Sequence, residues 1–95
     1  MFVDKQQLFD ATDGGLNIIT DYYPEARKAV ERKGTKFSIR PEKTPSCTLK
    51  LADDGVWLLT DFGDDSKPKN AIMICMELEG LSYGEACQFL GEKYK

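Results

Sequence analysis

The residue types that could bind a metal or act as nucleophiles in this chain are cysteine and aspartate, because its 95 residues include no histidine. Cysteine occurs three times, without CxxC spacing, as Cys47, Cys75 and Cys87. An odd number of cysteines cannot pair completely within one chain, and metal-binding cysteines usually come in close pairs. We therefore expect three reduced, buried thiols and a cytoplasmic protein.

The aspartates offer a second kind of chemistry, since Asp61, Asp64 and Asp65 stand close together. They could attract calcium or magnesium, but their spacing does not match an EF-hand loop, and a solvated acidic turn is the alternative. Asp61-Phe62-Gly63 also matches the metal-binding motif of kinases, yet the rest of a kinase's motifs are missing. Without histidine, a Ser/His or Cys/His hydrolase is excluded.

Charge is strongly segregated along the chain, although the net charge is only −3. Residues 24–50 carry a net charge of +5, and residues 51–66 carry −5. Such separation could create one face that attracts phosphate, or it could leave two solvated surfaces that largely neutralise each other. No segment is apolar and long enough to span a bilayer, and no basic stretch followed by an apolar one opens the chain.

The elements that must position these residues indicate a single α+β domain over residues 1–95, in which a small antiparallel sheet packs against several helices. Asp4 is placed to cap a first helix, Pro24 begins a third, Asp54-Gly55 is a strong hairpin signal, and Ser82 with Glu85 forms a capping-box pattern. Hydrophobic periodicity and turn residues predict helices at 4–11, 16–23, 24–34, 70–79 and from 82 onward, with strands at 36–39, 47–51 and 56–59.

Three segments together resemble the zinc-finger (CHC2-type) domain that opens bacterial and phage DNA primases. Residues 40–46 (Arg-Pro-Glu-Lys-Thr-Pro-Ser) resemble the family's loop after the first ligand pair, and 61–64 (Asp-Phe-Gly-Asp) fall where it has a C-F-G-C knuckle. Residues 70–86, with Glu-Gly-Leu-Ser-Tyr at 79–83, resemble its two closing helices. Order and spacing agree over about residues 14–93.

The resemblance implies a zinc-ribbon-like fold and a DNA-binding module of a replication protein, from a phage or mobile element. In that family the domain engages single-stranded template DNA and assists a separate polymerase domain that starts an RNA primer. The polymerase site has no counterpart in this chain, so we expect no catalysis. A polymerase or helicase domain would then be a partner, either in a longer form of the same chain or as a separate protein.

The chain departs from the family at all four zinc-ligand positions, which are Phe37, Arg40, Asp61 and Asp64. Zinc requires sulfur, imidazole or carboxylate donors in a tetrahedral arrangement, and neither phenylalanine nor a permanent cation supplies one. We therefore expect a metal-free domain without a cofactor. One hypothesis is that Arg40 bridges Asp61 and Asp64 where the metal would be; the alternative is that these charges diverged on an exposed loop.

Single-strand binders combine cationic grooves with aromatic side chains on which bases stack. We expect Trp57 to point away from the core beside Lys50, although a lone tryptophan in a small protein is more often a core residue. The predicted DNA-binding residues are Lys43, Lys36, Lys50, Trp57, Arg32 and Lys33. Binding to single-stranded DNA is expected to be weak and salt-sensitive. The alternative function is a degenerate protein–protein interaction module that kept the scaffold and lost metal and DNA binding.

Overall fold

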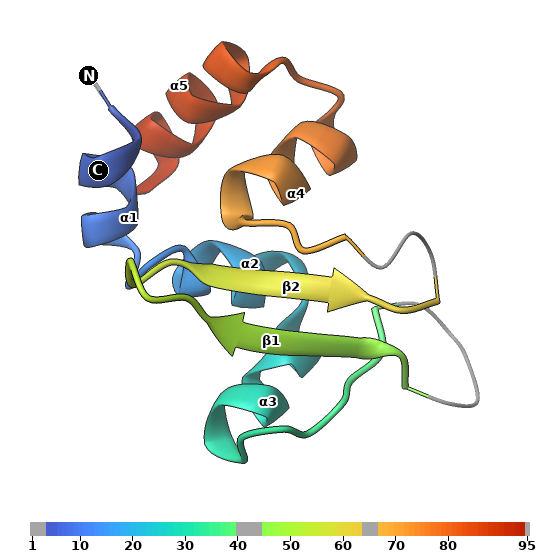
Figure 1. Ribbon diagram of the computed structural model, residues 1–95. Coiled ribbons are helices and arrows are strands. Elements are labelled where there is room, and N and C mark those ends of the chain that lie inside the picture. The colour runs from blue at the N-terminus through green and yellow to red at the C-terminus, as the bar shows by residue number, and fades with distance from the viewer. Residues whose placement is uncertain (1–3, 40–44, 64–66, 95) are drawn as a thin grey trace.

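The computed structural model describes residues 4–39, 45–63 and 67–94. These residues form five α-helices and a two-stranded antiparallel sheet, which confirms the expected α+β class (Figure 1). The elements follow one another as α1 (Lys5–Ala11), α2 (Leu16–Tyr22), a 3-10 turn (Pro24–Ala26), α3 (Arg27–Glu31), β1 (Cys47–Leu51), β2 (Trp57–Asp61), α4 (Ala71–Glu79) and α5 (Tyr83–Tyr94). None of the helices in these residues combines the length and apolar character needed to cross a membrane.

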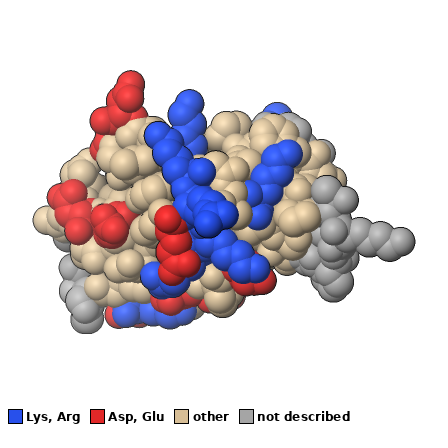
Figure 2. Space-filling model, turned by 90° about the horizontal axis from the view of Figure 1, so that it is seen from below, with Lys and Arg blue, Asp and Glu red and all other residues tan. Residues whose placement is uncertain are grey.

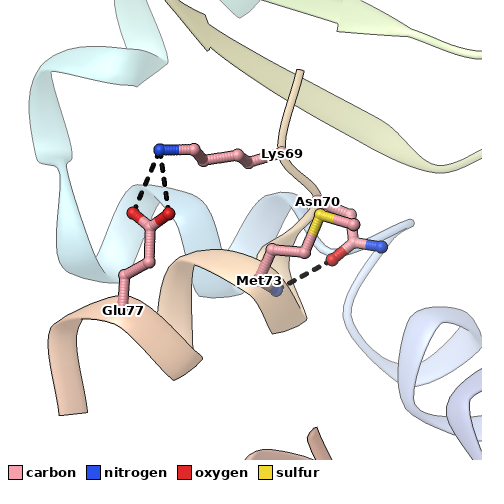
Figure 3. Close-up of polar contacts among 4 residues, drawn as sticks. All are labelled: Lys69, Asn70, Met73 and Glu77. Carbon is pink, nitrogen blue, oxygen red and sulfur yellow. Dashed lines mark hydrogen bonds and ion pairs between the residues drawn. The ribbon is translucent and has the colours of Figure 1, made fainter. Parts of the chain in front are cut away.

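Helix ends lie where the capping residues predict them. The side chain of Asp4 accepts a hydrogen bond from the Gln7 amide at the start of α1. At the start of α4 the Asn70 Oδ1 atom accepts one from the Met73 amide at 2.9 Å (Figure 3). Such caps satisfy amides that have no partner within the helix, and each typically stabilises by about 1 kcal/mol.

The capping box before α5 is also confirmed. The Ser82 amide donates to the Glu85 carboxylate, and the Glu85 amide donates to the Ser82 hydroxyl. These reciprocal bonds fix the beginning of α5 directly after the turn that leaves α4.

Two predicted elements are shorter than expected. The helix predicted over 24–34 is a 3-10 turn followed by α3, which ends at Glu31 because Arg32 has extended backbone angles. The strand predicted over 36–39 is reduced to one bridge, in which Phe37 exchanges two main-chain hydrogen bonds with Cys47. A single bridged residue satisfies its own amide and carbonyl but does not extend the sheet into a third strand.

The core lies between the helices and one face of the sheet. Cys47 and Leu49 on β1, with Leu59 and Asp61 on β2, belong to that face, as the register and the burial of their side chains agree. All three cysteines are buried reduced thiols, as expected. The helices and the bridge contribute most of the buried apolar side chains, among them Leu8, Phe9, Ile18, Ile19, Phe37, Ile72, Ile74, Ala86 and Leu90.

Candidate nucleic-acid interface

Two of the four positions that the resemblance assigns to zinc ligands are brought together across Cys47. Phe37 bridges Cys47 from one side, and Asp61 is paired with Cys47 from the other. Paired residues in antiparallel strands project to the same face, so the three side chains form one row toward the core. Phe37 is 2 % exposed and Asp61 is 5 % exposed. Arg40 and Asp64 lie outside the described residues, so the bridge from Arg40 to Asp61 and Asp64 remains a prediction.

The Asp61 carboxylate is buried and hydrogen-bonded. Its Oδ1 atom accepts from the Ser46 hydroxyl at 3.2 Å and from the Gly63 amide at 2.9 Å. These bonds connect the end of β2 to the residue that precedes β1, and they compensate the cost of taking a carboxylate out of water.

The described donor atoms do not fit zinc. Phe37 supplies no donor, and one Asp61 oxygen already accepts two hydrogen bonds. In the part of the chain that the structure describes, no three His, Cys, Asp or Glu side chains lie close enough to hold a metal ion together. Four donors in a tetrahedral arrangement are the rule for structural zinc.

A groove of about 330 Å³ lies between α3 and the hairpin. Most of its lining residues are apolar, and two are lysines. The lining residues are Ala29, Val30, Lys33, Leu49, Lys50, Leu51 and Trp57. Val30 is 37 % exposed and Leu51 is 51 % exposed, so part of the apolar lining of the groove is open to solvent.

The orientation expected for Trp57 is wrong. Trp57 is paired with Leu51, whereas Leu58 is paired with Lys50. The indole therefore shares the face of Leu49 and Leu59, is half-buried, and packs against the core cluster. It still lines the groove, which Lys33 and Lys50 also line.

Basic side chains gather on the face of the molecule that carries α3 and β1 (Figure 2). We call this the basic surface, and its exposed members are Arg27, Lys28, Arg32, Lys33, Lys36 and Lys50. Lys28 forms an exposed ion pair with Glu25, with 3.1 Å between the Nζ and Oε1 atoms, and Arg27 donates to the Thr20 hydroxyl. The described basic residues of the sequence block 24–50 are thus exposed on α3, on the residues that follow it and on β1.

The predicted DNA-binding residues fall into three groups. Lys33, Lys50 and Trp57 line the same groove. Arg32 and Lys36 are exposed on either side of the Gly34 turn after α3. Lys43 lies outside the described residues.

Sequence reasoning missed Val30 and Leu51, the exposed apolar residues of the groove. Two features of the sequence could have indicated them. Val30 is an apolar residue within a basic segment, and Leu51 is an apolar residue at the end of a strand.

A second cluster of ionisable residues lies on the helices, away from the groove. The Tyr22 hydroxyl donates to Glu79, the Tyr94 hydroxyl donates to Asp21, and the Lys93 ammonium lies over both tyrosine rings. Burial and these carboxylates raise the pKa of both tyrosines, so the hydroxyls remain donors.

These contacts join α2, α4 and α5, and their role is structural. Burial also raises the pKa of the Cys75 thiol, which disfavours the thiolate needed for nucleophilic chemistry.

Comparisons with protein families, with curated proteins and with solved structures found no match to this chain.

Proposed function

We propose that this domain is a non-catalytic, single-stranded DNA-binding module of a primase-like replication protein working in the cytoplasm. The observation that carries the proposal is the groove that Trp57, Lys33 and Lys50 line together. An aromatic side chain offers a surface for a nucleobase, and flanking ammonium groups attract the phosphates on either side of it. The resemblance of residues 40–46 and 70–86 to primase domains supports the same function.

The chemistry of the groove favours single strands over duplex. A base can enter an apolar groove beside Trp57 only when it is unpaired and unstacked. Lys33 and Lys50 then neutralise backbone charge, and the exposed Arg32 and Lys36 extend the cationic track. The affinity is modest and strongly salt-dependent, because few phosphates are neutralised and the acidic residues elsewhere repel DNA.

Fluorescence anisotropy with a labelled single-stranded oligonucleotide tests this function. If about three phosphates are contacted, log K falls with log salt concentration with a slope of about −2. The double variant Lys33→Ala/Lys50→Ala should bind more weakly and show a shallower slope. Lys5→Ala on α1 is the matched control, since it removes one exposed lysine away from the groove.

Two outcomes oppose the proposal. One is the absence of binding at about 100 µM protein in low salt, which is the weak end of nonspecific DNA affinity. The other is an equal loss of binding free energy per removed lysine in the groove variant and in Lys5→Ala, which would mean that DNA responds only to the overall charge.

A further inference from the structure

The outer edge of β1 carries main-chain groups that no other strand uses in the described part of the chain. In an antiparallel pair, successive residues direct their amide and carbonyl groups alternately toward the partner strand and away from it. Leu59 directs its groups away from β1, because it exchanges two hydrogen bonds of 2.8 Å with Lys69. Its partner Leu49 therefore directs its own groups outward from β1, and so does Leu51 two residues later.

The neighbouring outward groups of the sheet are occupied. The outward amide and carbonyl of Cys47 form hydrogen bonds with Phe37. On the other edge of the sheet, the Trp57 amide donates to the Gly14 carbonyl at 2.9 Å. Within residues 4–39, 45–63 and 67–94, no main-chain bond beyond the β1–β2 pairing involves Leu49 or Leu51. Two amides and two carbonyls thus form a short open edge, and such an edge is a template for another strand.

The apolar groove runs along this same edge. Three consecutive β1 residues line it, and the Lys50 side chain lies on the opposite face from those of Leu49 and Leu51. A groove that contacts all three must follow the edge of the strand and not only one face. Val30 and Trp57 complete an apolar wall on the core side.

We propose that this edge binds an extended, acidic segment of a partner protein, which adds to β1 as a further strand. Main-chain bonds to Leu49 and Leu51 supply the affinity, as in other strand-addition complexes. Alternate side chains of the segment enter the groove beside Trp57 and are therefore apolar. The side chains between them emerge near Lys50 and are acidic. This inference goes beyond the proposed function and does not depend on DNA binding.

Charge decides between this occupant and a second copy of the chain. Pairing two β1 edges would bring the basic surfaces of both copies together, with Lys50 near its own counterpart, and like charges close together are destabilising. An acidic segment instead complements Lys33 and Lys50. Single-stranded DNA has no regular series of amides and carbonyls that could match the edge groups. It would therefore bind in the groove without pairing to the main chain of β1.

The test uses a synthetic peptide of about seven residues in which glutamate and valine alternate. Amide hydrogen exchange by NMR, recorded with the peptide at up to about 1 mM, should slow at least about tenfold at Leu49 and Leu51. The same peptide with lysine in place of glutamate is the control and should leave these amides unchanged.

A variant probes the main-chain bond directly. Leu51→Pro removes an amide that points away from β2, a position where edge strands tolerate proline. It should weaken peptide binding about fivefold, the value of one hydrogen bond, while Leu51→Val retains binding.

The proposal is overturned if the acidic peptide does not bind, or if it binds and protects amides elsewhere. It is also overturned if the lysine peptide protects Leu49 and Leu51 equally. Oligonucleotide binding without peptide binding would leave the proposed DNA-binding function unaffected and would overturn the proposed addition of a strand to β1.

Discussion

Gly14 is the position where a single added methyl group should most disturb the fold. A Cβ atom there would lie 2.0 Å from the Gly55 carbonyl oxygen, in the hairpin turn, and 3.2 Å from the Trp57 ring. Both the close approach and the φ of +69° require glycine. The carbonyl of Gly14 itself accepts a hydrogen bond from the Trp57 amide, so movement of this turn also disturbs that bond.

The cost has two parts that a control can separate. A left-handed φ costs a non-glycine residue about 1–2 kcal/mol. Forcing the main chain apart to accommodate an extra methyl group adds about 1–3 kcal/mol. Gly80 has the same φ of +69°, and a methyl group there would meet no atom of the described residues within 4 Å, so Gly80→Ala carries only the first part. We therefore expect Gly14→Ala to lose about 1–3 kcal/mol more than Gly80→Ala.

Urea unfolding measures the difference, with circular dichroism for the helices and the fluorescence of Trp57, the chain's single tryptophan, for the hairpin. Total stability for a domain of this size is about 5–14 kcal/mol, so both variants should still fold. Equal losses in the two glycine variants would refute the reasoning, because they would mean that the α1–α2 turn is not packed against the hairpin.

Three further predictions concern Asp61, the absence of zinc and the cap of α5. Asp61→Ala should reduce the free energy of unfolding by about 1–3 kcal/mol in urea titrations, since it leaves the Ser46 hydroxyl and the Gly63 amide without this acceptor. A chelator should leave the melting temperature unchanged, and elemental analysis should find less than one zinc per chain. Hydrogen bonds from Ser82 lower the pKa of Glu85 below its usual value, so the folded state gains from the charged form. That stability is present above the unfolded pKa of about 4.3 and is lost as the pH falls through the folded pKa, so Glu85→Gln should flatten the fall of the melting temperature in acid.

The capping residues and turn glycines predict the helices because their physics is local. Asp4, Asn70 and Ser82 each accept a hydrogen bond from an amide within a few residues, so the sequence alone contains both partners. The same holds for Gly80, whose left-handed conformation ends α4.

The face on which Trp57 lies could not be predicted, because it depends on the length of the hairpin loop. The Ala52 amide donates to the Val56 carbonyl, so three residues form the loop, and Gly55 takes the left-handed position at its end. An Asp-Gly pair is compatible with a two-residue loop as well as with this three-residue loop. A shift of one residue moves every side chain of a strand to the opposite face, so the prediction placed Trp57 beside Lys50 and away from the core.

The groove itself was beyond sequence reasoning for a related reason. Val30 and Trp57 are far apart in the chain and meet only because α3 packs beside β1. The early end of α3 at Glu31 leaves Arg32, Lys33 and the Gly34 turn exposed along that side. Patterning identified the lysines, whereas the apolar wall between them required the tertiary structure.

The row of Phe37, Cys47 and Asp61 bears on how the domain closes around its core. In the zinc-finger domains that the chain resembles, a structural zinc would bring the two corresponding segments together with about 10–16 kcal/mol of apparent binding energy. Here both segments are held on the same residue, since Phe37 exchanges two main-chain bonds with Cys47 and Asp61 faces it across β1–β2. Phe37 is among the largest fully buried side chains, and its apolar burial contributes about 1.5–3 kcal/mol. Local contacts of this size do not equal a zinc ion, so most of the stability must come from the helical core that packs behind the row.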